Sequence, residues 1–383
     1  MTFWKNFALA FKGGSGRSRP SLGRSYIGTY GGAFFSGTAP FSYEASVREA
    51  YVENAVAQRA VRIVSEAVAD APLMPLQDKA AALIGQSVAG QPLLETITAH
   101  LLLHGNAYVQ IAGVAEEVGR NNPPELYALR PDRITVEPDA TGWPAAYVYR
   151  AGEHETRYPA NDAAGPVQIV HIKAFHPTDD HYGLGCLGAA AGAVAVHNRA
   201  SDWNRALLDN AARPSGALVH DPGPDGAHLS GEQVDRLRAE MEASFSGRDN
   251  AGRPLLLEGG LSWQALSMTP AEMDFVALKA AAAREIALAF GVPPMLLGLP
   301  GDNSYANYRE ANRALWRLTI LPLAGKILEG LSRGLKPWWP DLDLRVDRDQ
   351  IPALSEDRER MWNQISAADF LTGEEKRKLL GID

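Results

Sequence analysis

The 383-residue chain has one cysteine, Cys186, and no long apolar run. One cysteine cannot form a disulfide within the chain, and it cannot supply the several thiolates of a cysteine-based zinc site. No stretch approaches the roughly 18 uninterrupted apolar residues of a membrane span. Lys5 interrupts the apolar N-terminus and no small-residue cleavage site follows it, so we expect no signal peptide. These absences predict a protein of a reducing compartment without a membrane span.

Two catalytic motifs are also missing. The sequence has no G-x-x-x-x-G-K-[ST] loop to hold the phosphates of ATP, so the chain does not hydrolyse ATP through that type of site. It has no G-x-S-x-G elbow for a nucleophilic serine, and no candidate base flanks Cys186. We therefore expect no catalytic residues, no metal, no cofactor and no enzymatic activity.

The net charge of −8 is unevenly distributed along the chain. A tight DNA binder needs basic surface that displaces counterions from the phosphates. Residues 1–40 hold five bases and no acid, whereas residues 341–383 hold 11 acids and 7 bases. The acidic total therefore opposes tight DNA binding by the chain as a whole.

An apolar content of 46% and a charged content of 21% are typical of a folded globular protein. The length predicts two or three packing units. Residues 12–40 are rich in Gly and Ser and show no sustained period, so we expect residues 1–40 to be a flexible, basic, Gly-rich arm. The rest of the chain predicts an α+β fold that is mainly helical.

Apolar residues at helical spacing predict several helices with clear end signals. Asp70-Ala-Pro72 stops the first helix, Gly105 ends the second, and Gly291 ends a later one before Pro293-Pro294. The predicted helices cover about residues 43–69, 93–105, 186–212, 229–245, 274–290 and 304–335, before a polar helical tail.

Two further signals refine these helices. Ser230 with Gln233, and Thr372 with Glu375, have the spacing of capping boxes at helix N-termini. Pro322 lies inside the longest predicted helix, where it removes one backbone donor and should kink it.

Short alternating segments between turn signals predict strands. Two of the helices, 186–212 and 274–290, are rich in alanine and bracket a small β-α-β unit. Alanine lets helices approach closely, which suits a ring of many copies packed side by side, or else a pair of buried helices in one core. The predicted strands cover residues 107–111, 125–129, 134–137, 146–149, 167–174, 216–220, 254–258 and 261–266.

One glycine-rich stretch could bind a dinucleotide. Gly183, Gly185 and Gly188 match G-x-G-x-x-G before a helix. The preceding strand ends near Ala174, however, and a loop replaces the tight strand-to-helix turn of such sites. The acid expected about 20 residues further on is also missing, because Asp202 lies in the middle of a helix.

A histidine-rich loop could suggest a metal site. His171, His176 and His181 lie near Asp179 and Asp180. A five-residue spacing fits neither one face of a helix nor one face of a strand. We therefore interpret His171 as a buried strand residue and the two aspartates as part of a solvated turn.

Several distinctive segments follow one another in a fixed order, and REIALAFGVPPMLLG at 284–298 is the most specific of them. From the N-terminus these segments contain Asn106 and Tyr108, Arg130 and Pro131, then Asn210, Arg213 and Pro214, then Gly291, Pro293 and Pro294, and finally Asn307. In this order, across about residues 45–381, they resemble the tailed-phage portal protein family. The C-terminal segment 371–381 also resembles the family's ending, although Gly373 and Glu374 replace its usual Pro-Asn. The modest length and simple tail resemble, more narrowly, the portal of a gene transfer agent, a domesticated phage particle.

The resemblance implies a phage portal fold with parts named wing, stem, clip and crown. After the arm at 1–40, the wing would comprise residues 41–182 and 292–340, and the stem residues 183–212 and 270–291. The clip would comprise residues 213–269, and a small crown residues 341–383. The resemblance also implies a channel loop made of Leu299, Pro300, Gly301, Asp302, Asn303 and Ser304.

The resemblance further implies a ring, typically of twelve copies, at one capsid vertex of a virion assembled in the bacterial host cytoplasm. Its expected partners are other copies of itself, the major capsid protein, the large terminase as a separate motor ATPase, a head–tail adaptor, and double-stranded DNA that passes non-specifically during packaging and ejection. The missing phosphate loop agrees with a separate motor. Two other classes stay open: a soluble nucleotide-binding enzyme that uses Gly183–Gly188, and a non-viral scaffold.

Overall fold

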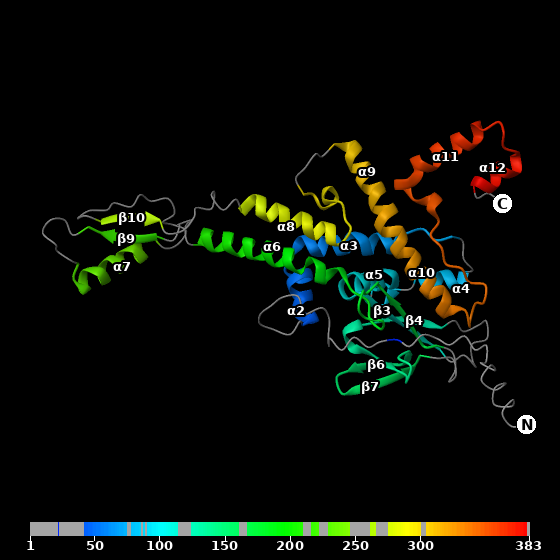
Figure 1. Ribbon diagram of the computed structural model, residues 1–383, viewed down its shortest axis with the longest axis horizontal. Helices are drawn as coiled ribbons and strands as arrows, with labels where there is room; N and C mark the ends of the chain where they lie inside the picture. Colours follow the sequence, from blue (N-terminus) through cyan, green and yellow to red (C-terminus); the bar gives the residue numbers. More distant parts are fainter. Residues whose placement is uncertain are drawn as a thin grey trace, which may run out of the picture.

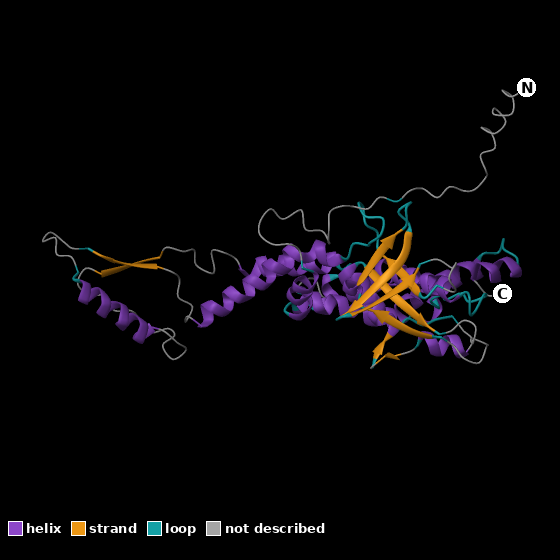
Figure 2. Ribbon diagram, turned by 90° about the horizontal axis from the view of Figure 1, so that it is seen from below, coloured by secondary structure: helices purple, strands orange, loops and turns teal. Residues whose placement is uncertain are grey.

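The computed structural model describes residues 22, 42–74, 78–85, 87–88, 90–113, 124–160, 167–209, 216–221, 229–245, 261–265, 275–299 and 304–380. The described part is elongated (Figure 1). Helices and two three-stranded sheets form a body, from which a pair of helices projects towards a small unit at the far end. Figure 2 shows the strands gathered on one side of the helices of the body. The helices of the body are α2 (Tyr43–Val47), α3 (Ala55–Ala69), α4 (Asp78–Ile84), α5 (Leu93–His104), α9 (Tyr305–Leu315) and α10 (Leu321–Leu335).

The first predicted helix is interrupted in the structure. The pattern predicted one helix over residues 43–69, but α2 runs into a π-helical turn (Arg48–Val52) and α3 begins only at Ala55. Asn54 has an extended backbone, and its Oδ1 accepts hydrogen bonds from the N–H groups of the two residues that follow Ala55. An asparagine in this position begins a new helix, because it satisfies donors that have no partner within the helix.

Strand β3 is buried on both faces in the centre of the body. Ala107, Val109 and Ile111 belong to the main core beside the helices, whereas Tyr108 belongs to a smaller core with Tyr147 of the second sheet. This division follows from the two-residue period of a strand. The two antiparallel sheets have the strand orders β4-β3-β8 and β5-β6-β7. The strands are β3 (Asn106–Ala112), β4 (Glu125–Leu129), β5 (Ile134–Pro138), β6 (Pro144–Ala151), β7 (His154–Pro159) and β8 (Ile169–Lys173), with a separate hairpin of β1 (Ser87–Val88) and β2 (Gln91–Pro92).

The longest helical stretch covers one face of the main core. α9 continues through a π-helical turn (Trp316–Ile320) into α10. The N–H of Leu321 bonds to the carbonyl of Trp316, and Pro322, which has no N–H, follows immediately. The sequence predicted a kink at Pro322. The structure has a π-helical turn directly before it, and such a turn is one of the ways in which a helix accommodates an interruption of its hydrogen-bond pattern. Ile327, Leu331 and Leu335 of α10 are fully buried.

The projecting pair consists of α6 (Cys186–Asp209) and α8 (Phe275–Ala289), which pack along each other (Figure 1). Towards the far end, the rings of Trp203 and Phe275 stack with their centroids 6.1 Å apart. Near the body, the Nδ2 of buried Asn54 donates to Oδ1 of Asn198 at 2.8 Å, so the cap of α3 also holds α6.

The small unit at the far end contains β9 (Gly216–His220), α7 (Gly231–Phe245) and β10 (Leu261–Ala265). β9 and β10 pair antiparallel. The predicted capping box of α7 is confirmed, because Ser230 Oγ accepts from the N–H of Gln233 and the Gln233 side chain accepts from the N–H of Ser230. The predicted strand at 254–258 lies outside the described residues.

The C-terminal segment first packs on the body and then leaves it. Leu344 is buried in the main core, and its N–H donates to Ser332 Oγ at 3.0 Å. After Leu354 the chain forms α11 (Ser355–Ala367) and α12 (Gly373–Leu380), which stand away from the body in Figure 1. The capping box between Thr372 and Glu375 is confirmed as well. None of the helices among the described residues is long and apolar enough to cross a membrane.

Candidate functional site

The junction between the body and the projecting pair is organised around Asn106, at the start of β3. Its side chain is completely buried and forms hydrogen bonds in both directions. Its Oδ1 accepts from the N–H of Gly183 at 2.7 Å, and its Nδ2 donates to the carbonyl of the same residue at 3.2 Å. This amide therefore fixes the segment that leads into α6 against the centre of the body, 77 residues away in sequence.

Two histidines complete this network. Nε2 of His171 lies 3.0 Å from Oδ1 of Asn106, and because that oxygen can only accept, Nε2 carries the proton. Nδ2 of Asn106 lies 3.2 Å from Nδ1 of His104, which is therefore the acceptor. The ring of His171 stacks on Tyr108, with centroids 4.3 Å apart. Burial lowers the pKa of both His104 and His171 to about 3, so both rings are neutral at physiological pH.

The glycines of the G-x-G-x-x-G stretch have a structural role in this junction. Gly105 ends α5 with a φ of 82°, and the backbone at Gly183 and Gly185 packs directly on it. A Cβ at Gly183 would lie 2.6 Å from the N of Ala174, and one at Gly185 would lie 2.6 Å from the carbonyl O of Leu103. The chain's own backbone therefore fills the space that a dinucleotide phosphate would need, and the structure does not support the nucleotide interpretation.

The histidine-rich loop does not assemble a metal site. Among the described residues, no group of three or more His, Cys, Asp or Glu side chains is placed to hold a metal ion. His176 Nδ1 accepts from the N–H of Thr178 at 3.1 Å. Asp179 Oδ1 accepts from the N–H groups of His181 and Tyr182 at 2.7 and 2.9 Å, so this carboxylate organises the turn.

The motif residues Arg130, Pro131, Gly291, Pro293 and Pro294 lie at or beside turns. Pro131 is buried and starts a 3-10 turn between the two sheets, next to Arg130, whose guanidinium pairs with Asp132 at 2.7 Å. Gly291 has a φ of 67°, and its carbonyl accepts from Thr319 Oγ1 of the π turn at 2.7 Å. Pro293 caps, and Pro294 begins, a 3-10 turn that ends at Gly298. Asn210, Arg213 and Pro214 lie outside the described residues.

The structure describes only the two ends of the predicted channel loop. The N–H of Leu299 bonds to the carbonyl of Pro294, and Ser304 caps α9 by accepting from the N–H of Asn307 at 3.2 Å. Pro300, Gly301, Asp302 and Asn303 lie outside the described residues. The loop is thus flanked by a 3-10 turn on one side and by the N-cap of α9 on the other.

Helix α9 carries an arginine pair that the sequence reasoning missed. Arg309 and Arg313 both contact the carboxylate of Glu356 on α11, the second at 2.6 Å. Arg313 also pairs with Glu310 at 3.0 Å. The i, i+4 spacing of the two arginines was visible in the sequence, but nothing in the sequence connected them to an acid 43 residues beyond Arg313.

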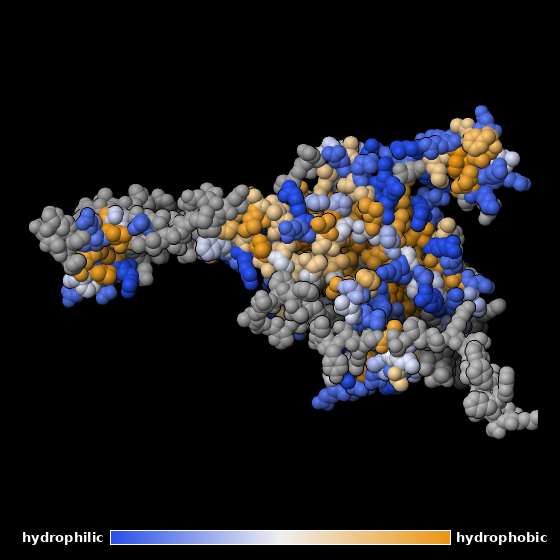
Figure 3. All heavy atoms as spheres, in the orientation of Figure 1, coloured by the Kyte–Doolittle hydropathy of each residue, from blue (hydrophilic) through white to orange (hydrophobic). Residues whose placement is uncertain are grey.

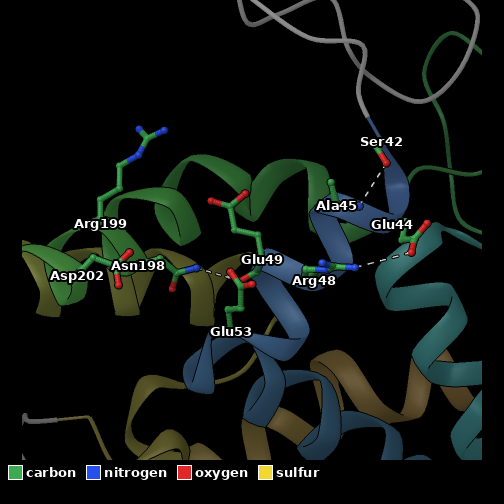
Figure 4. A pocket seen from close by; sticks show the side chains of 9 residues that line it. All are labelled: Ser42, Glu44, Ala45, Arg48, Glu49, Glu53, Asn198, Arg199 and Asp202. Atoms are coloured by element: carbon green, nitrogen blue, oxygen red, sulfur yellow. Dashed lines mark hydrogen bonds and ion pairs between the residues drawn. The ribbon is translucent and has the colours of Figure 1, made fainter. Parts of the chain in front are cut away.

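A polar pocket of about 610 Å³ lies between the first described helix and α6 (Figure 4). Nδ2 of Asn198 donates to the backbone carbonyl of Glu49 at 2.9 Å across this pocket. No sequence prediction had placed a site here. Its lining residues are Ser42, Glu44, Ala45, Arg48, Glu49, Glu53, Asn198, Arg199 and Asp202.

Comparison with known proteins agrees with this architecture. The sequence model of the family described as "Phage portal protein" matches residues 55–381. The chain belongs to the phage portal protein family. The family predicted from the ordered motifs is thereby confirmed, and with it the α+β portal fold.

Relatives of this portal protein support the same conclusion. An uncharacterised protein of Rickettsia felis is 38% identical over 349 residues, which cover 87% of this chain and 88% of the relative. The portal protein of enterobacteria phage HK97 is 24% identical over 262 residues, which cover 66% of this chain and 56% of the HK97 protein. A chain in the neck of a native gene transfer agent particle, determined with C12 symmetry, is 47% identical, covers 90% of this chain and 94% of its own, and has a TM-score of 0.69. The function is therefore that of a portal at a capsid vertex.

Proposed function

We propose that twelve copies of this portal protein close into a ring around an axial DNA channel. A separate motor ATPase drives double-stranded DNA through this ring during packaging, and the same channel releases the DNA after tail attachment. The observation that carries the copy number is the chain at 47% identity in a particle neck with C12 symmetry.

The surface of the described residues supports assembly with further copies. Several large apolar side chains lie on the outside, and Figure 3 shows apolar surface over the projecting helix pair. Phe175, Val276 and Leu288 are 82%, 83% and 79% exposed. Large apolar patches on a soluble protein mark interaction sites. In a closed ring each copy offers two different faces to its two neighbours, so identical surfaces create one axial channel.

The elements fit the parts of a portal as follows. The body, residues 41–182 and 292–340, serves as the wing, and α6 with α8 serves as the stem. The small unit of β9, α7 and β10 serves as the clip, which faces the large terminase and later the head–tail adaptor. The C-terminal helices α11 and α12 serve as the crown inside the capsid, and the wing contacts the major capsid protein. Assembly takes place in the cytoplasm of the bacterial host.

The channel loop, Leu299–Ser304, lines the constriction in this proposal. Its short polar side chains touch phosphates weakly and reversibly, which permits sliding. The described residues on either side, the turn that starts at Pro294 and the N-cap Ser304, attach this segment to the wing.

The ring is tested by electron microscopy of the purified protein, with its mass measured by light scattering. A ring of about twelve copies with a hole wide enough for a DNA duplex supports the proposal, and a compact dimer contradicts it. The loop is tested by Asp302→Arg, which should reduce the amount of packaged DNA because twelve added cations hold the duplex at the constriction. Unchanged packaging would contradict this role of the loop. Gln364→Arg on the exposed face of α11 adds the same charge away from the loop and from the clip, and serves as control.

A further inference from the structure

Two exposed helix faces on the projecting pair have complementary shapes. One face of α6 is exposed along its length. It carries exposed residues at intervals of three and four, namely Gly188, Gly192, Val196, Arg199 and Trp203. Apart from the helix's own backbone, no atom lies within 4 Å of the position that a Cβ would take at Gly188 or Gly192. This face, the α6 groove, is therefore open and shallow at its body end.

The exposed face of α8 has a projection instead of a groove. Ala277, Ala281, Glu285 and Leu288 share one face at the same intervals, and all are exposed. Leu288 is 79% exposed and is the largest apolar side chain of these four. We call this face the α8 ridge. Burial of such a leucine in a matching groove is favourable, because it removes apolar surface from water.

The groove and the projection lie at the same level along the pair. The stacked rings of Trp203 and Phe275 fix the register of the two antiparallel helices. Leu288 follows Phe275 by thirteen residues, and the residue thirteen places before Trp203 is Ala190. Leu288 is therefore level with the turn between Gly188 and Gly192. In the proposed stem the pair runs along the ring axis, and a rotation about that axis moves a copy without shifting it along the axis, so such a contact requires matching levels.

The charges of the two faces are also complementary. Arg199 is the exposed base of the α6 groove and Glu285 is the exposed acid of the α8 ridge. Among the described residues, neither has an ion pair within its own chain, whereas Asp202 and Arg205 of α6 pair with each other. A contact between two α6 grooves would bring two arginines together, and a contact between two α8 ridges would bring two glutamates together. Both arrangements place like charges next to each other, which is unfavourable. Only groove against ridge places opposite charges on facing surfaces; in the register above Glu285 is level with Ala193, so the long Arg199 side chain has to reach along the groove towards it.

We infer that the α8 ridge of one copy docks in the α6 groove of the next copy, with Leu288 seated between Gly188 and Gly192. This inference rests on the proposed ring and names the surfaces that close it. The contact joins two different faces, so it repeats from copy to copy instead of stopping at a dimer.

The first test blocks the groove. In Gly192→Leu the new side chain occupies the space for Leu288, and each contact should weaken by roughly tenfold or more. Rings should then be lost at concentrations where the wild type forms them, while circular dichroism and thermal unfolding show a folded chain. Gly231→Leu, at another open glycine on α7, is the matched control and should leave the rings intact. Rings of Gly192→Leu at wild-type concentrations would overturn the inference, whereas a wild type that forms no rings would contradict the proposed function itself.

The second test does not depend on the strength of the contact. Copies with Gly192→Cys are mixed with copies with Leu288→Cys, both in a Cys186→Ala background that removes the natural thiol. Mild oxidation should give a disulfide-linked dimer of the two variants, visible by mass spectrometry. Copies with Gly231→Cys mixed with the same partner should give far less. Equal cross-linking of both mixtures would overturn the inference.

Discussion

Replacing Asn106 tests whether the buried amide holds the projecting pair on the body. In Asn106→Ala the N–H and the carbonyl of Gly183 both lose a hydrogen-bond partner in a place that water does not reach. The proton on Nε2 of His171 loses its acceptor as well.

The expected loss follows from these groups. A buried polar group that loses its partner costs about 1–3 kcal/mol, while an ordinary hydrogen bond contributes about 1 kcal/mol net. With two backbone groups and one ring N–H affected, we expect the free energy of unfolding of the body to fall by about 4 kcal/mol.

Guanidinium chloride unfolding of the non-assembled chain, followed by circular dichroism, measures this loss. Asn363→Ala on the exposed face of α11 is the matched control and should change the free energy of unfolding by less than about 0.5 kcal/mol. A loss below about 1 kcal/mol for Asn106→Ala would refute the reasoning, because it would mean that the groups around Asn106 find other partners.

Three further predictions concern the same junction and its neighbours. Burial lowers the pKa of His104 to about 3, so as the pH falls the unfolded chain takes up a proton on this histidine before the folded chain does. The free energy of unfolding should therefore drop by roughly 1.4 kcal/mol per pH unit between about pH 6.5 and pH 3. In His104→Phe, unfolding curves measured across this range should lose the contribution of this one histidine to the pH dependence. Gly183→Ala should prevent folding of the junction, because its Cβ would meet backbone atoms, and limited proteolysis would detect cleavage before α6, whereas Gly192→Ala should leave the pattern unchanged. Glu356→Gln should loosen α11 from α9, since two arginines lose their shared carboxylate, and hydrogen exchange of 355–367 should rise while that of α10 stays constant.

Local signals in the sequence predicted most elements of this fold. The capping boxes at Ser230 and Thr372, the turn at Gly105 and the end of α3 depend on neighbouring residues, so a short window contains the information. β7 was missed for the opposite reason. Most of its side chains are exposed, so it lacks the apolar alternation by which a strand is recognised.

The sites were harder to predict than the elements. Asn106 was named as a motif residue, but its bonds to Gly183 and His171 bridge 77 and 65 residues, and no periodicity encodes such pairs. The Gly183–Gly185 stretch shows the same limit, because glycine serves close backbone packing as well as phosphate binding. The interruption at Asn54 was missed because its apolar neighbours continue the helical period, while the side chain that breaks the helix also holds α6.

The path of the chain through the projecting pair has a consequence for how this protein can diversify. The chain leaves the body along α6 and returns along α8, so the small unit of β9, α7 and β10 is an insertion between the two helices of one packed pair. Among the described residues, none of the main core belongs to this unit. Recombination that exchanges the segment between 209 and 275 can therefore deliver a new docking module to the same body. In the proposed portal, where this unit is the clip, such an exchange would change the surface that docks the tail adaptor and leave the rest of the chain as it is.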